Sequence, residues 1–185
     1  MPKDSSRPPE LILREFLEEI GLTGDEELAD THARVTEFLR SFAPNSSEPT
    51  LSLVPTSSSD PIIIRELVFH SLCAHHLLPF FGKATVAILP NGTISGLGGI
   101  PRALRHYAQQ PQIQERLGAQ LAGFLLDRLK AEAVVVSLTA THLCMEMRGS
   151  RASGEVLAVA ARGTQEGISR LELLMAGARI VDDVH

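Results

Sequence analysis

Two short segments of the chain gather the side chains that bind soft metal ions. Residues 73–76 read CAHH and residues 142–144 read HLC, and together they hold both cysteines and three of the seven histidines. Thiolates and imidazoles are the ligands that zinc commonly takes in proteins. Cys73, His76 and Cys144 would therefore form a site with two sulfur ligands and one nitrogen ligand. Three protein ligands leave the fourth tetrahedral position open for water, as in catalytic zinc sites.

The second segment is expected to lie on a long strand over residues 132–148, which opens with three valines. Residues two apart on a strand point to the same side. One face would then carry a histidine, a thiol and two charged groups: His142, Cys144, Glu146 and Arg148. Such a face is costly to bury without ligands or partners, and this favours a metal site.

The other histidines of the two segments, His75 and His142, would flank the ion without ligating it. An imidazole titrates near neutral pH and is suited to proton transfer. Three alternatives stand beside this hypothesis. A lone cysteine or histidine is more often an ordinary buried or surface residue than a ligand, two thiols can form a disulfide, and His70 could complete a closed structural zinc site. The position of both cysteines beside histidines favours the catalytic metal site.

Hydrophobic spacing predicts the elements that must position these residues. Helices are expected over residues 10–20, 31–42, 100–108, 112–130 and 165–177. Strands are expected over residues 61–69, 82–89, 132–148 and 154–162. The turn sequence Pro90-Asn91-Gly92 further predicts a hairpin in which residues 93–97 return along strand 82–89.

The order of these elements indicates an α+β fold with a largely antiparallel sheet, because strands and helices mix without strict alternation. A stretch with clustered serines and three prolines follows the first two helices. We therefore expect an N-terminal helical appendage over residues 1–45, a linker over residues 46–60 and a catalytic domain over residues 61–185.

The bulk composition is that of a soluble globular protein, with 44% hydrophobic and 21% charged residues among 185. The net charge of −5 does not suggest a nucleic-acid partner, which would select a basic face. No segment is long and apolar enough to suggest a membrane span, and the N-terminus lacks the apolar stretch of a signal peptide. A cytoplasmic location is therefore expected, and there free or metal-bound cysteines are more common than disulfides.

Three stretches of the sequence resemble the GTP cyclohydrolase I family in their motifs, order and spacing. They are SLCAHHLLPFFGKATVAILPNG at 71–92, PQIQERLGAQLAGFLLDRL at 111–129 and ATHLCMEMRG at 140–149. The resemblance covers residues 31–42 and 65–175. It implies the tunnelling fold, an antiparallel sheet with two long helices packed on one side, and zinc held by Cys73, His76 and Cys144. It also implies a homo-oligomer, usually a decamer of two pentamers, with active sites at subunit boundaries.

The resemblance implies a hydrolase that opens the guanine imidazole ring of GTP, releases formate and forms 7,8-dihydroneopterin triphosphate. A zinc-activated water would attack C8 of the guanine. His142 would donate a proton to the imidazole-ring nitrogen, and His75 would assist proton transfer at the opened formamide. Gln114 and Glu115 would hold the guanine edge. Three arginines would face the phosphates: Arg148, Arg102 and Arg34.

The chain departs from the family pattern at several positions. Ala74 stands where the family usually has Glu, Gly98 and Gly99 stand where it has Ser and Lys, and Glu37 stands where it often has a basic residue. The changes at 98–99 and 37 remove positive charge from the expected phosphate pocket. Two alternatives therefore stay open: the same chemistry on a guanine compound with fewer phosphates in a specialised pathway, or a zinc-binding paralogue without catalysis.

Overall fold

The computed structural model describes residues 7–44 and 47–182, with side chains described as far as residue 177. The chain divides into two compact units, Met1–Ala43 and Pro44–His185, and each is described by itself. None of the helices within the described residues combines the length and apolar character that crossing a membrane requires.

The N-terminal unit is a pair of helices joined by a short helical turn. Helix α1 spans Pro9–Glu19, the 3-10 turn η1 spans Glu26–Leu28 and helix α2 spans Thr31–Ser41. Proline suits the first turn of α1 because an N–H is not needed there. The two helices predicted from the sequence are thus confirmed, with ends that shift by one residue.

The second unit is built on a five-stranded sheet of order β5-β2-β3-β6-β7. Its strands are β5 (Pro111–Gln112), β2 (Ile62–Cys73), β3 (Pro79–Leu89), β6 (Ala133–His142) and β7 (Glu155–Gly163). Only the short β2–β5 pair is parallel, and the other three pairs are antiparallel. The expected α+β class with a largely antiparallel sheet is confirmed.

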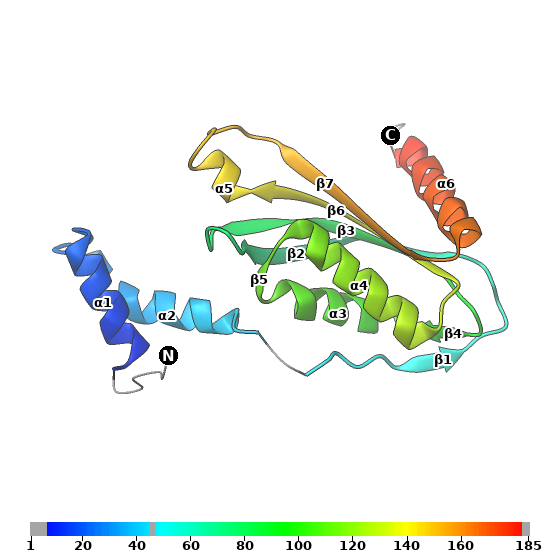
Figure 1. The fold of residues 1–185 in the computed structure, drawn as a ribbon, viewed down its shortest axis with the longest axis horizontal. Helices are drawn as coiled ribbons and strands as arrows, with labels where there is room; N and C mark the ends of the chain where they lie inside the picture. Colours follow the sequence, from blue (N-terminus) through cyan, green and yellow to red (C-terminus); the bar gives the residue numbers. More distant parts are fainter. Residues whose placement is uncertain (1–6, 45–46, 183–185) are drawn as a thin grey trace. The chain divides into compact units, whose positions relative to one another are not determined.

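Helices cover the sheet on both faces (Figure 1). Helices α3 (Gly99–Ala108) and α4 (Gln114–Leu129) pack on one face, and α6 (Gln165–Asp182) contributes to a separate cluster on the other. Side chains that alternate along β6 divide between the two clusters: Val134, Val136 and Leu138 face α4, whereas Ala133 and Val135 lie with Leu171 of α6. Each fully buried leucine of α4 contributes about 1.5–3 kcal/mol relative to an exposed one. The two helices on one side, expected from the family, are α3 and α4, and the longest helix lies opposite.

The predicted hairpin after strand β3 is wrong. Strand β4 (Thr93–Ser95) pairs with β1 (Leu53–Pro55) in a separate two-stranded sheet. The physical reason is that β3 already has β2 on one side and β6 on the other, so it has no edge to offer a returning strand. The partner β1 lies inside the stretch expected to be a linker.

The predicted strand over 132–148 is too long. Strand β6 ends at His142, and the short helix α5 (Leu143–Glu146) follows directly. The neighbouring strand β3 offers no partner beyond this point, because it begins at Pro79 and its pair with β6 nearest that end joins Phe80 to His142. Without a ladder partner the backbone turns into a helix. His142, Cys144, Glu146 and Arg148 therefore do not share one strand face.

Candidate metal centre

Cys73 is the last residue of β2, and the chain reverses directly after it into β3. The Cys73 N–H donates to the carbonyl of Leu78 at 2.8 Å, and the Leu77 N–H donates to the carbonyl of Cys73 at 2.8 Å. Leu77 adopts a left-handed conformation with φ of +54°. This tight turn presents His76 beside the Cys73 thiol, with 3.8 Å between Sγ and Nδ1.

A second strand fastens the turn from its other side. The backbone of Gln112 in β5 pairs with Cys73, and its carbonyl accepts from the Ala74 N–H at 2.8 Å. The Gln112 side chain is itself buried, and its Nε2 donates to the Tyr107 carbonyl at 2.9 Å. Sequence reasoning missed this role, because a glutamine beside a proline carries no signal of burial.

Cys144 completes a group of three close ligand atoms. The atoms offered by Cys73, His76 and Cys144 all lie within 4.8 Å of one another. A tetrahedral ion with bonds of 2.0–2.3 Å has ligand-to-ligand edges of roughly 3.5 Å, so small side-chain movements close this group around one ion. The structure shows both thiols free and not joined in the disulfide considered as an alternative.

The electrostatics of the two thiols suit a cation between them. Burial raises the pKa of the Cys144 thiol, and the adjacent Cys73 raises it further, while Arg148 opposes the shift. Two neighbouring thiolates repel each other unless a positive charge separates them. A bound divalent ion reverses this preference and favours both thiolates. The donor set therefore fits a soft metal ion.

His75 lies beside the group without belonging to it. Its Nδ1 is 3.7 Å from the Cys73 Sγ, yet its nitrogens are not among the mutually close ligand atoms. Its side chain is exposed. His75 is thus placed next to the centre and is free to contact a bound molecule.

His142 reaches the same region from the end of β6. Its ring stacks on Phe80 with 4.7 Å between ring centroids and 5° between the planes. Its Nε2 lies 2.7 Å from Oε1 of Gln114, the first residue of α4. Burial lowers the pKa of His142, and the carboxylate of Glu115 partly offsets this effect. The ring is therefore held on one face and at one nitrogen.

Comparison with known proteins identifies the family to which this arrangement belongs. The sequence profile described as GTP cyclohydrolase I matches residues 10–174 of the chain. The chain belongs to the GTP cyclohydrolase I family. It is 40% identical over 156 residues to GTP cyclohydrolase 1 of Corynebacterium glutamicum, covering 80% of each chain. It is 39% identical over 173 residues to GTP cyclohydrolase 1 of Rhodopirellula baltica, covering 89% of this chain and 76% of the relative.

A third relative and one solved structure complete the comparison. GTP cyclohydrolase 1 of a Sulfurihydrogenibium species is 41% identical over 144 residues, covering 77% of each chain. The crystal structure of the archaeosine synthase QueF-Like in the apo form aligns with a TM-score of 0.49 and 16% identity, covering 59% of this chain and 98% of that one.

The side chain of Gln114, which the family resemblance implies as a guanine ligand, is buried in the chain. The residue is 1% exposed, and its Nε2 donates to the carbonyls of Leu138 and Val156, both at 2.8 Å. With its Oε1 against His142, the amide is engaged within the chain. The expected role of Gln114 in holding guanine stays a prediction. Glu115, the next residue, is exposed in the first turn of α4.

The three arginines expected at the phosphates of a GTP cyclohydrolase I substrate are divided between the two units of the chain. Arg148 is exposed just beyond α5, and Arg102 is exposed in the first turn of α3. Arg34 belongs to the N-terminal unit, where its guanidinium donates to the Glu27 carbonyl at 3.1 Å. Arg148 and Arg102 thus share the unit of the metal centre, and Arg34 does not.

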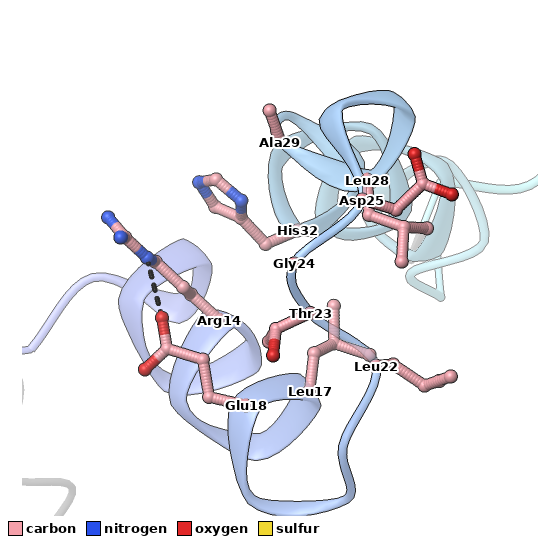
Figure 2. Close-up of a pocket in the computed structure, with 10 residues that line it drawn as sticks. All are labelled: Arg14, Leu17, Glu18, Leu22, Thr23, Gly24, Asp25, Leu28, Ala29 and His32. Atoms are coloured by element: carbon pink, nitrogen blue, oxygen red, sulfur yellow. Dashed lines mark hydrogen bonds and ion pairs between the residues drawn. The ribbon is translucent and has the colours of Figure 1, made fainter.

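A hollow within the N-terminal unit offers chemistry different from that of the metal centre (Figure 2). It lies among α1, η1 and the start of α2, and mixes leucines with polar residues. On one wall of the hollow, Arg14 of α1 donates to Glu18, one turn later in the same helix, at 3.0 Å. His32 of α2 also lines the hollow. Both cysteines of the chain lie in the other unit, so this hollow cannot supply the thiolate ligands of a family metal centre.

Proposed function

We propose that the chain is a zinc-dependent GTP cyclohydrolase I, a hydrolase that acts on a cyclic amidine. It opens the guanine imidazole ring of GTP, releases C8 as formate and forms 7,8-dihydroneopterin triphosphate. One observation carries this proposal: the ligand atoms of Cys73, His76 and Cys144 lie within 4.8 Å of one another. The chain that holds them is 39–41% identical to several proteins named GTP cyclohydrolase 1.

The proposed metal is zinc, held by Cys73, His76 and Cys144. Two thiolates with one imidazole favour zinc over harder ions, which prefer oxygen ligands. When bound, the ion supplies Lewis acidity that lowers the pKa of a water molecule toward neutrality. The protein's contribution is to hold three ligands on a turn and a helix and to leave the fourth position to solvent.

The neighbouring side chains have proposed roles in moving protons and holding guanine. His142 donates a proton to the imidazole-ring nitrogen of the purine, and His75 assists proton transfer at the opened formamide. Glu115 accepts hydrogen bonds from N1–H and the 2-amino group of guanine, because a carboxylate can meet both donors at once. All three belong to the unit that carries the ligands.

Three arginines are proposed to bind the phosphates: Arg148, Arg102 and Arg34. Arg34 belongs to the N-terminal unit, and the other two belong to the unit that carries the metal ligands. The family assembly, a decamer of two pentamers, places active sites at subunit boundaries. Strand β7 supports such pairing, because it forms one edge of the described sheet and exposes Leu157 and Val159.

The assembly and the compartment follow from the same proposal. Ten chains of 20.0 kDa would give a particle of about 200 kDa, which light scattering on the purified protein measures directly. A monomer or dimer at assay concentration would contradict the decamer. Free thiols at the metal site fit a reducing compartment, so we propose a cytoplasmic location.

The deciding experiment incubates zinc-loaded protein with GTP and follows formate together with the ultraviolet absorption of the product. We expect formate and a product with the ultraviolet absorption of a pterin to form in equal amounts. A matched sample of the Cys144→Ala variant controls for contaminating activity. Absence of formate from GTP and from every other guanine compound tested would contradict an enzymatic role and support a zinc-binding paralogue.

A second candidate substrate is a guanine compound with fewer phosphates. Gly98 and Gly99 carry no side-chain charge, and the Gly99 N–H already donates to the Gly96 carbonyl at 2.9 Å. A missing charge-assisted contact weakens binding by about 1.5–3 kcal/mol, which is roughly one to two decades in affinity. Turnover of GTP, GDP, GMP and guanosine separates the two candidates. If GMP or guanosine has the higher kcat/KM, GTP is not the substrate.

A further inference from the structure

The side chain of Gln114 has one orientation that its surroundings permit. Its Nε2 lies 2.8 Å from the carbonyl oxygen of Leu138 and 2.8 Å from that of Val156. An amide NH2 group can donate to both carbonyls, whereas an amide oxygen in that place would face two acceptors. The flipped amide is therefore excluded by its partners, and Oε1 must be the atom that faces His142.

This orientation decides which nitrogen of His142 carries a proton. Oε1 of Gln114 lies 2.7 Å from Nε2 of His142. An amide oxygen accepts hydrogen bonds and cannot donate them, so Nε2 must be the donor. In the neutral imidazole the proton then sits on Nε2, and Nδ1 keeps the free lone pair.

The ring is also held against rotation. Phe80 lies directly across from His142 in the β3–β6 ladder, and the two rings are parallel within 5°. The carbonyls that fix Gln114 come from neighbouring strands, Leu138 from β6 and Val156 from β7. A buried aromatic ring and two strands thus hold the imidazole through one short chain of contacts.

We propose that Gln114 is a positioning residue that fixes His142 in the Nε2–H tautomer and leaves Nδ1 as the ring nitrogen that meets the substrate. To donate at Nδ1, the ring first takes up a proton there from solvent and becomes an imidazolium; transfer of that proton to the purine nitrogen returns it to the neutral Nε2–H tautomer, and the Nε2 proton stays with Gln114 throughout. The catalytic consequence rests on the proposed function, but the tautomer itself does not.

Helix α4 packs on the sheet at Gly118, one turn after Gln114. A Cβ at Gly118 would lie 3.4 Å from the Cβ of Ala160 and 3.5 Å from Cδ1 of Leu138. The first turn of α4 therefore rests on β6 and β7.

The first test measures the tautomer in the unmodified, zinc-loaded chain without substrate. Magic-angle-spinning NMR of protein labelled with 15N-histidine distinguishes a protonated Nε2 from a protonated Nδ1 and does not depend on particle size. The His142 signal is assigned by its loss in His142→Asn. A neutral ring protonated at Nε2 is expected. A neutral ring protonated at Nδ1 overturns the proposal.

The second test removes the acceptor with Gln114→Met, which keeps the length of the side chain. We expect a mixture of both His142 tautomers and a fall in kcat of about tenfold to a hundredfold, as for other partners that orient residues at metal sites, with KM little changed. A single Nε2–H tautomer with unchanged kcat in this variant overturns the proposal.

Gln112→Met is the matched control. Gln112 is equally buried at 1% exposure, and its Nε2 also donates two hydrogen bonds, to Tyr107 and Gln120. It does not contact His142, so the His142 tautomer should stay unchanged; a shift to Nδ1–H here would overturn the proposal. If Gln114→Met does not fold, the His142 tautomer measured in the unmodified chain still tests the proposal. A chain that releases no formate refutes the proposed function while leaving the tautomer measurement intact.

Discussion

The two thiols of the candidate centre reach it from different kinds of structure. Cys73 ends a strand and is buried, while Cys144 lies in the helical turn α5 and is half-buried. Each is free in the structure, and burial, together with the adjacent Cys73, raises the pKa of Cys144. At the scale of single residues, the site therefore depends on ligand chemistry that one substitution can remove.

Replacing Cys144 by alanine should abolish metal binding. Two remaining ligands hold zinc much more weakly than three, so we expect bound zinc, measured by elemental analysis, to fall from about one ion per chain to near zero. Formate release should fall with it by about a hundredfold or more. Met145→Leu, on the same helical turn, should retain the metal. Full zinc occupancy in Cys144→Ala would exclude Cys144 as a ligand.

Glu115→Gln tests recognition of guanine by a carboxylate. Loss of the charge should weaken the paired hydrogen bonds by about 1.5–3 kcal/mol, so kcat/KM for GTP should fall about tenfold to a hundredfold. The control is Glu166→Gln, because Glu166 occupies the first turn of α6 as Glu115 occupies the first turn of α4. Equal effects of the two substitutions would mean that Glu115 acts on its helix and not on a ligand.

At the scale of elements, backbone packing decides what each loop and helix end can carry. The start of α3 is an example, since Gly99 is buried against Ser95 of β4 and Leu51. A Cβ there would lie 2.4 Å from the Ser95 Oγ and 2.9 Å from a Leu51 methyl carbon. At Gly98 the nearest atom is the Arg102 guanidinium at 3.2 Å, at the end of a flexible side chain.

Gly99→Ala should therefore destabilise the protein, and Gly98→Ala should not. Overpacking at a tight site costs about 1–3 kcal/mol, so urea unfolding should show a lower midpoint for Gly99→Ala. Gly98 has α-helical backbone angles that alanine accepts, and its substitution should leave the midpoint unchanged or slightly raised. A normal midpoint in Gly99→Ala would show that β4 and Leu51 can move apart.

The end of α4 offers the opposite case. Lys130 follows the helix in a left-handed conformation with φ of +53°. A non-glycine residue in this conformation carries a steric penalty that glycine avoids. We expect Lys130→Gly to stabilise the protein by about 0.5–1 kcal/mol, measured as a higher midpoint of urea unfolding, whereas Lys130→Val should lower that midpoint.

At the scale of the whole molecule, the metal centre joins parts of the chain that are far apart in sequence. The candidate ligands Cys73 and His76 lie at the turn after β2, and Cys144 lies in the helix after β6. An ion that binds only the folded state adds about 2.7 kcal/mol when its free concentration is a hundred times Kd. Metal content and global stability should therefore be coupled.

Removing the ion with a chelator should lower the thermal unfolding temperature, and adding zinc should restore it. The Cys144→Ala variant serves as the control, because its unfolding temperature should not respond to either treatment. Differential scanning fluorimetry measures both proteins side by side. If the unmodified chain unfolds at the same temperature with chelator and with zinc, the ion does not cross-link these two segments.

The sequence alone predicted the longer helices, most of the strands and the three residues whose ligand atoms come together. Hydrophobic spacing specifies which face of a helix is buried, and Leu117, Leu121 and Leu125, spaced four apart in α4, are buried. The pairing of cysteines with histidines in two motifs was equally local information. These features lie within short stretches, where residue type and spacing are enough.

Only the tertiary structure decided which strands pair, where β6 ends and what Gln114 contacts. Thr93–Ser95 pairs with β1 because both edges of β3 are occupied, and β6 stops at His142 because the partner strand stops there. Gln114 orients His142 because three strand and helix segments meet around its amide. Each outcome depends on groups distant in sequence competing for the same hydrogen-bonding partners, which no local pattern encodes.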